Sequence, residues 1–345
     1  MSDALKDALA LLPSIVCASV AFSLSFVVSG ALWFNVSMTV AVFAACMWFL
    51  LRNSQWRMGA TVISSLVVLA VLIGPSVIDR MASRPAPVSQ ELVQHLAAAA
   101  IPLDDLEPLR KVWRGTRVIA LGKPDRRITE FLITQMGFRN FAMEMAFDDA
   151  NATDVYIQGT AAKTVPSDEI VEWMRTYNAS VPKVDRVHFH GIDYQGDRRD
   201  FRMARNVLAL IETLGPEGRL ILWSRNAQVS SAPGRMGSYL RSTLRDQLYL
   251  TGYEFDRGFV GRYEVPPADS RYYAATLRQT GKPALFLDFR TLMLQPALET
   301  WIERAQFTHE VQDYYGPVRL LPSWTRTDDS WSSLFDGVIY TEQRQ

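Results

Sequence analysis

Side chains suited to proton transfer are scarce in this chain, whose 345 residues include only four histidines. His188 and His190 lie two residues apart in a predicted strand and therefore share one of its faces, with Asp193 just beyond them. That spacing would suit a metal ion. A pair without a third ligand is also typical of an ordinary sheet-face or hydrogen-bonding role, and we expect neither a metal nor a cofactor. His95 and His309 are isolated in the sequence.

A second candidate site follows a predicted strand that begins at Arg219 and ends, after a run of three apolar residues, at Trp223. The run has the length and composition of a buried strand, and the sequence then turns polar at Arg225, Asn226 and Gln228. Ligands of α/β proteins bind at such carboxyl ends of strands. Arg225 would bind an anionic ligand there, or form a salt bridge within the domain.

Further polar side chains follow the other predicted strands. Lys123 and Arg126 come after the first strand, Glu144 ends the second, and Asp193 and Gln195 end the third. The two cations would form an electropositive rim, although basic residues of this kind are usually only solvated. Glu144 is either a site carboxylate or a structural partner for an arginine. Asp193 and Gln195 would orient the end of their strand.

The elements that must position these residues alternate between strand and helix from about residue 90 onward. This alternation is typical of a mainly parallel sheet covered by helices on both faces. Strands are predicted at 117–121, 140–145, 187–193, 219–223, 249–255 and 284–289. Helices are predicted at 90–100, 104–113, 127–136, 168–178, 198–214, 236–247 and 270–279.

The chain before this domain has a different character. Three apolar runs without a charged residue occupy 8–28, 31–51 and 58–78, and each has about the twenty residues that a helix needs to cross a bilayer. They predict a transmembrane anchor of three helices over residues 1–80, with the lipid bilayer as its partner. A proline-containing linker at 81–89 then leads to the α/β domain at 90–345.

Charge patterns give the expected orientation and exclude one class of partner. Lys6, Arg52 and Arg57 would lie on one side of the membrane, against Arg80 and Arg84 on the other. This small excess predicts a cytoplasmic amino terminus and a periplasmic or otherwise extracytoplasmic domain at the inner membrane. The 36 basic residues equal the 36 acidic ones, so we expect no nucleic-acid partner.

Seven segments of the chain carry a resemblance to a known family, and they are 91–122, 137–144, 172–178, 187–195, 222–226, 236–241 and 335–340. Taken in order along the chain, they resemble the erythromycin esterase family. They span about residues 90–345, and the ordered set is far more specific than any single piece. The resemblance implies a three-layer α/β/α domain. It also implies hydrolysis of an ester or macrolide lactone, with histidines and acids activating a water and the second-strand glutamate in the site.

The chain departs from the family at the positions that carry the chemistry. Family members follow the first strand with Gly-Glu-x-x-His-Gly, where this chain has the shorter, altered loop 122–127. The later family motif is Trp-x-His-Asn-x-His, and Arg225 and Gln228 replace its two histidines. Arginine stays charged and glutamine does not titrate, and the loss of a general base typically costs about 10² to 10⁴ in rate. Of the implied catalytic set only Glu144 remains.

The sequence therefore favours a membrane-anchored, catalytically degenerate member that binds a small anionic ligand or a protein partner at the former active site. The alternative is a hydrolase that retains activity around Glu144, His188 and His190. If Arg225 or Arg126 reaches Glu144, the ion pair would stabilise the ionised carboxylate and make it a poorer base.

Overall fold

The computed structural model describes residues 88–123, 125–160, 169–260, 263–304, 308–309 and 329–344. The predicted membrane segment at 1–80 and most of the linker at 81–89 lie outside these residues. Among the described residues, no helix is both long and apolar enough to cross a bilayer. The three-helix anchor therefore stays a prediction.

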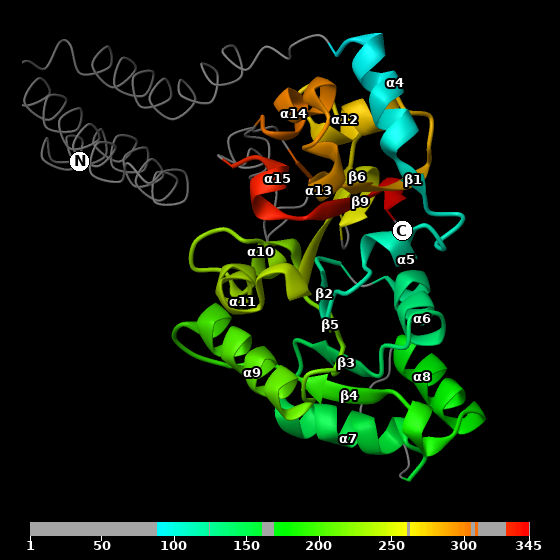
Figure 1. Ribbon diagram of the computed structural model, residues 1–345, viewed down its shortest axis with the longest axis vertical. Coiled ribbons are helices and arrows are strands. Elements are labelled where there is room, and N and C mark those ends of the chain that lie inside the picture. Colours follow the sequence, from blue (N-terminus) through cyan, green and yellow to red (C-terminus); the bar gives the residue numbers. More distant parts are fainter. Residues whose placement is uncertain are drawn as a thin grey trace, which may run out of the picture. The chain divides into compact units, whose positions relative to one another are not determined.

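A mixed sheet runs through the described part of the domain, in the order β1-β8-β9-β6-β2-β5-β3-β4, with β7 beside β6 (Figure 1). The stretch from β9 to β4 is parallel, whereas β1, β7 and β8 pair in the antiparallel sense. The strands are β1 Ile101–Pro102, β2 Val118–Leu121, β3 Asn140–Met143, β4 His188–Gly191, β5 Leu220–Trp223, β6 Leu248–Val260, β7 Tyr263–Val265, β8 Ala284–Asp288 and β9 Gly337–Arg344.

Helices cover both faces of this sheet, and the buried side chains of β2 alternate between two apolar clusters. Val118 and Ala120 belong to one apolar cluster, whereas Ile119 and Leu121 belong to a second one. The first cluster includes side chains of α4 Gln90–Ala99, α9 Arg199–Thr213, α11 Met236–Leu244, α12 Tyr273–Arg278, α13 Phe289–Leu292, α14 Pro296–Ile302 and α15 Trp331–Leu334. The second includes side chains of α5 Leu109–Val112, α6 Arg126–Thr134, α7 Phe147–Ile157 and α8 Glu169–Ser180.

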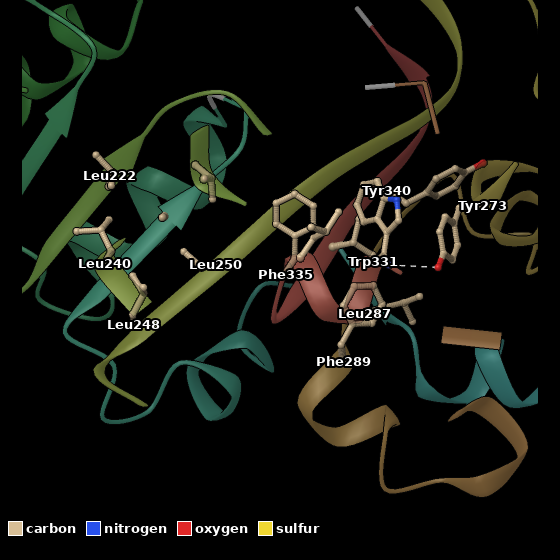
Figure 2. Packing of buried hydrophobic residues seen from close by; sticks show 14 of the residues in the cluster. Leu222, Leu240, Leu248, Leu250, Tyr273, Leu287, Phe289, Trp331, Phe335 and Tyr340 are labelled. Carbon is tan, nitrogen blue, oxygen red and sulfur yellow. Dashed lines mark hydrogen bonds between the residues drawn. The ribbon is translucent and has the colours of Figure 1, made fainter. Parts of the chain in front are cut away.

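Figure 2 shows how part of the first cluster is built. Trp331 and Phe335 of the carboxyl-terminal segment pack at a ring distance of 5.2 Å, and the backbone amide of Trp331 donates to the hydroxyl of Tyr273 at 3.3 Å. The same view labels Leu222 of β5, Leu240 of α11 and Leu248 and Leu250 of β6, which belong to this cluster. Burial of side chains of this size stabilises the fold by roughly 1.5 to 3 kcal/mol each.

The predicted helix at 104–113 is wrong over its first half. Asp105 accepts a hydrogen bond from the amide of Glu107 at 2.9 Å, which closes a local turn. Pro108 then stands at the N-cap, so only the short α5 that begins at Leu109 is helical. The proline cannot donate a backbone hydrogen bond, and a helix through this position would lack one.

The remaining predicted elements differ from the structure mainly at their ends. The strand predicted at 249–255 is longer, since β6 continues to Val260 and there pairs with β7. The helix predicted at 270–279 starts later, at Tyr273. The short strands β1 and β7 were not predicted.

Candidate functional site

The carboxyl ends of the parallel strands place the predicted site residues along one edge of the sheet. Because β3 pairs in parallel with both β4 and β5, the residues that follow these three strands meet there. Glu144 follows β3, Asp193 follows β4, and Ser224 and Arg225 follow β5. Strand direction thus brings together residues that are far apart in the sequence.

Both carboxylate oxygens of Glu144 accept hydrogen bonds, and the side chain is only 14% exposed. The Ser224 hydroxyl donates to Oε1, and the guanidinium groups of Arg199 and Arg225 each donate to Oε2 at 3.2 Å. The predicted pairing of Arg225 with Glu144 is confirmed. The sequence left Arg225 and Arg126 open as partners of Glu144, and the structure shows Arg126 with other acids.

Arg126 is held elsewhere because its own helix supplies an acid one turn away. Its Nε lies 2.6 Å from Glu130 of α6, and its Nη1 lies 3.1 Å from Glu169 of α8. Residues i and i+4 face the same side of a helix, so this pair forms locally. Arg126 therefore braces two helices, and its predicted role in ligand binding gains no support from this arrangement.

Arg199 links the ends of β3 and β4, and the sequence did not reveal it as a site residue. Its guanidinium lies 2.6 Å from Asp193 as well as 3.2 Å from Glu144. Asp193 also accepts bonds from the amide of Tyr194 at 2.8 Å and from the side chain of Gln195 at 2.7 Å. Burial opposes ionisation of Asp193, but the hydrogen bonds and charge of Arg199 outweigh it and lower its pKa.

Asn226 is a structural clamp in addition to being a predicted binding residue. Its side-chain amide donates to the carbonyl of Tyr253 on β6 at 2.7 Å, and its side-chain oxygen accepts from the amide of Tyr253 at 2.9 Å. A Cβ atom at Gly122 would lie 2.1 Å from the Asn226 side-chain oxygen, so only glycine allows this approach. Lys123 is held nearby, with its ammonium group 3.0 Å from the Tyr253 hydroxyl and 4.1 Å from that ring's centre.

Gln228 is almost completely buried in the short helix α10, Asn226–Val229, and its side-chain oxygen has no hydrogen-bond partner among the described residues. Arg225, in contrast, has a half-exposed side chain. Neither residue can take and return a proton near neutral pH. Both therefore leave the loop after β5 without the titratable groups that the family motif implies.

His188 and His190 do not join this cluster. His188 pairs in register with Asn140, at the start of β3, and its ring lies 3.6 Å from Asp154. The His190 ring lies 3.2 Å from the side-chain oxygen of Asn140, and its burial lowers its pKa although Asp154 opposes the shift. Within the described ranges, no group of three or more potential ligands could hold a metal ion.

An open cleft of about 600 Å³ lies beside Arg199, and we call it the arginine cleft. It is formed where α9 and α11 begin, and sequence reasoning missed it because its residues come from two separate helix starts (Figure 1). Asp200 in its wall accepts a hydrogen bond from the amide of Met236 at 3.3 Å, and burial raises its pKa against the influence of Arg235. The lining residues are Arg198, Arg199, Asp200, Phe201, Gly234, Arg235 and Tyr239.

Comparison with known proteins relates this arrangement to a family. The family model for erythromycin esterase matches residues 133–201 and 194–344, which together exceed half of the chain. An erythromycin esterase type II from Escherichia coli is 30% identical over 116 residues, which cover 26% of this chain and 26% of that protein. The chain thus matches about a quarter of that relative's length.

Solved structures agree on the fold. A succinoglycan biosynthesis protein has a TM-score of 0.59 at 17% identity, covering 75% of this chain and 98% of its own. A Bacillus cereus protein has a TM-score of 0.60 at 16% identity, covering 74% and 98%. An erythromycin esterase mutant in its open conformation has a TM-score of 0.51 at 10% identity, covering 72% and 95%. Because the family model matches more than half of the chain, the chain belongs to the erythromycin esterase family.

Proposed function

We propose that this chain is a membrane-anchored, erythromycin-esterase-like protein that has lost hydrolytic activity and binds a small anionic ligand beside Glu144. The observation that carries the proposal is the hydrogen bonding of Glu144. One of its carboxylate oxygens accepts from Ser224, and the other accepts from Arg199 and Arg225. The one carboxylate retained from the implied catalytic set is therefore occupied by the protein itself.

A general base must have an oxygen free to accept a proton from water. Two guanidinium groups lie 3.2 Å from Oε2 of Glu144 and compete with water for its lone pairs. The positions of the two motif histidines hold Arg225 and the buried Gln228, so no second titratable group replaces them. This arrangement supports a binding role over a hydrolytic one.

The charge around the site supports an anionic ligand. Arg225 keeps about half of its side chain exposed while it contacts Glu144, and the adjacent arginine cleft is lined by three arginines and one aspartate. A cleft with such a cationic surface attracts anions. The apolar runs at 8–28, 31–51 and 58–78 support attachment to the inner membrane. The excess of basic residues at Lys6, Arg52 and Arg57 supports a domain on the extracytoplasmic side.

A residual hydrolase is the second candidate, and one contact favours it. The Ser224 hydroxyl donates to Glu144 at the carboxyl end of β5, where a reacting group could lie. The esterase activity named for family relatives makes an ester or lactone the substrate to test. His188 is the first residue of β4, and the ring of His190 contacts the side chain of Asn140 at the start of β3, so this candidate rests on Glu144 and Ser224 alone.

A measurement of ester hydrolysis distinguishes the binding protein from the residual hydrolase. Full-length protein, purified in detergent, is incubated with a macrolide and with simple nitrophenyl esters, and hydrolysis is measured for the wild type and for Glu144→Gln. We expect no turnover above the detergent blank. Turnover that Glu144→Gln abolishes would overturn the proposal. Arg257→Gln is the matched control, because Arg257 forms an exposed pair with Glu342 outside the site.

The orientation is tested separately. A reporter that is active only outside the cytoplasm is fused after residue 345, and its activity is compared with that of a reporter active only inside. We expect the extracytoplasmic reporter to be active. The opposite result would place the domain in the cytoplasm and overturn the proposed localisation.

A further inference from the structure

The arginine cleft has two cations that the protein leaves largely uncompensated. Arg198 has no ion-pair partner among the described residues, and Arg235 approaches Asp200 only to 3.9 Å. Arg199 differs, because Asp193 and Glu144 already hold its guanidinium. The cleft therefore has two guanidinium groups that remain available to bind a ligand.

These two arginines occupy equivalent positions on the two helices that frame the cleft. Arg198 is the N-cap of α9 and Arg235 is the N-cap of α11, and neither side chain caps its own helix. Arg198 also has a φ of 57°, which is uncommon for a residue with a Cβ atom. Since each helix presents the positive end of its dipole here, the backbone adds to the positive potential of the two side chains.

The cleft also has an apolar wall. The rings of Phe201 and Tyr239 pack edge to face with their centres 5.2 Å apart, and both residues line the cleft. Phe201 belongs to the first turn of α9, and Tyr239 to the first turn of α11. The aromatic pair thus lies beside the two arginines, where it can contact the organic part of a ligand.

We propose that the ligand of the arginine cleft is a phosphate monoester, with its phosphate between Arg198 and Arg235 and its organic group against Phe201 and Tyr239. This inference rests on the proposed function and names the chemical class of its anion. A phosphate carries close to two charges at neutral pH and three acceptor oxygens, enough for two guanidinium forks. A monocarboxylate has two oxygens and one charge, so it satisfies only one fork.

The test compares two probes that differ in the anionic group. Phenyl phosphate and benzoate share an aromatic ring, and each is titrated calorimetrically into full-length protein in detergent at pH 7.5. We expect phenyl phosphate to bind at least tenfold more tightly than benzoate. Arg198→Gln and Arg235→Gln should each weaken phenyl phosphate binding at least tenfold, whereas the control Arg257→Gln should leave it unchanged.

The outcomes separate this inference from the proposed function. Equal affinity for the two probes, or phenyl phosphate binding that survives both arginine substitutions, would overturn the phosphate inference and leave a small-anion role standing. Binding of neither probe would overturn both proposals. Ester turnover that depends on Glu144 would overturn the non-catalytic role alone. The wild-type comparison of the probes decides the ligand class even if a variant fails to fold.

Discussion

Two carboxylates in this domain are each held by two arginines, and they lie at opposite ends of the sheet. Glu144 at the carboxyl ends contacts Arg199 and Arg225. Asp336, just before β9, contacts Arg241 and Arg290. Their side chains are nearly equally buried, at 14% and 12% exposure. Burial alone therefore does not distinguish the two clusters, and the difference lies in their other partners.

The Asp336 cluster is tied to backbone. Asp336 accepts from the amide of Leu250 at 2.7 Å, and both of its arginines also donate to the carbonyl of Leu248, at 3.2 Å and 2.7 Å. Tyr249 adds a bond to Asp288, and burial together with that carboxylate raises the pKa of its hydroxyl, which remains a donor. These bonds join the start of β6 to the start of β9 and to the end of β8.

The Glu144 cluster has a different construction. The bonds to its carboxylate come from the side chains of Ser224, Arg199 and Arg225, which belong to loops or to the first turn of a helix. Arg199 also lines the arginine cleft. The comparison indicates that the same pairing of charges stabilises strand pairing at one end of the sheet and arranges a ligand cleft at the other.

Asp336→Asn should have the largest effect on stability. The amide cannot compensate Arg241 and Arg290, and it presents a donor toward them in place of an acceptor oxygen. We expect the free energy of unfolding to fall by about 3 kcal/mol, the scale found when one partner of a buried ion pair is removed. Urea denaturation followed by tryptophan fluorescence measures it. A loss below about 1 kcal/mol would contradict the structural role of this cluster.

Glu144→Gln should lower the free energy of unfolding less than Asp336→Asn does, by about 1 kcal/mol, although the two carboxylates are nearly equally buried. Arg199 keeps its contact with Asp193, and the half-exposed Arg225 can be rehydrated. The measurement is the same urea denaturation, compared directly with Asp336→Asn. A loss as large as that of Asp336→Asn would show that the two clusters do not differ in the way proposed.

The pH dependence of stability should show the contribution of the ionised Asp193 carboxylate. Its pKa in the folded protein is lowered from 3.8, so the folded state favours the carboxylate more strongly than the unfolded state does. The resulting stabilisation is fully present well above pH 3.8 and is lost as the pH falls below that value through the folded pKa. Asp193→Asn should therefore flatten the acid limb of a plot of stability against pH. An unchanged acid limb would contradict the assignment.

Much of the parallel sheet was predictable because its strands are short apolar runs, as at Leu220–Trp223, where all four residues are buried. The two-residue β1 and three-residue β7 were not, because so few residues give no periodic pattern. The helix at 104–113 was overestimated because the local hydrogen bond of Asp105 competes with helix formation.

Within the site, strand ends predicted the positions of Glu144, Asp193 and Arg225, and one of two possible arginine partners for Glu144 is confirmed. Arg199 could not be predicted, since it lies 55 residues from Glu144 and no sequence spacing connects a helix start with the end of another strand. The arginine cleft was missed for the same reason. The packing of α9 against α11 forms this cleft, and no local sequence motif predicts that packing.

Arg225→Gln should have the smallest effect on stability. We expect it to lower the free energy of unfolding by about 0.5 kcal/mol or less, because exposed ion pairs contribute little to stability. Its side chain is 49% exposed, against 30% and 36% for the arginines of Asp336. Salt sharpens the contrast, since a Debye length of about 3 Å at 1 M screens exposed charges far more than buried ones. The effect of Arg225→Gln should vanish in 1 M NaCl while that of Asp336→Asn persists, as urea denaturation at both salt concentrations would measure. Equal salt sensitivity would mean that salt screens both sets of ion pairs to the same extent, which would contradict the contrast between the two clusters.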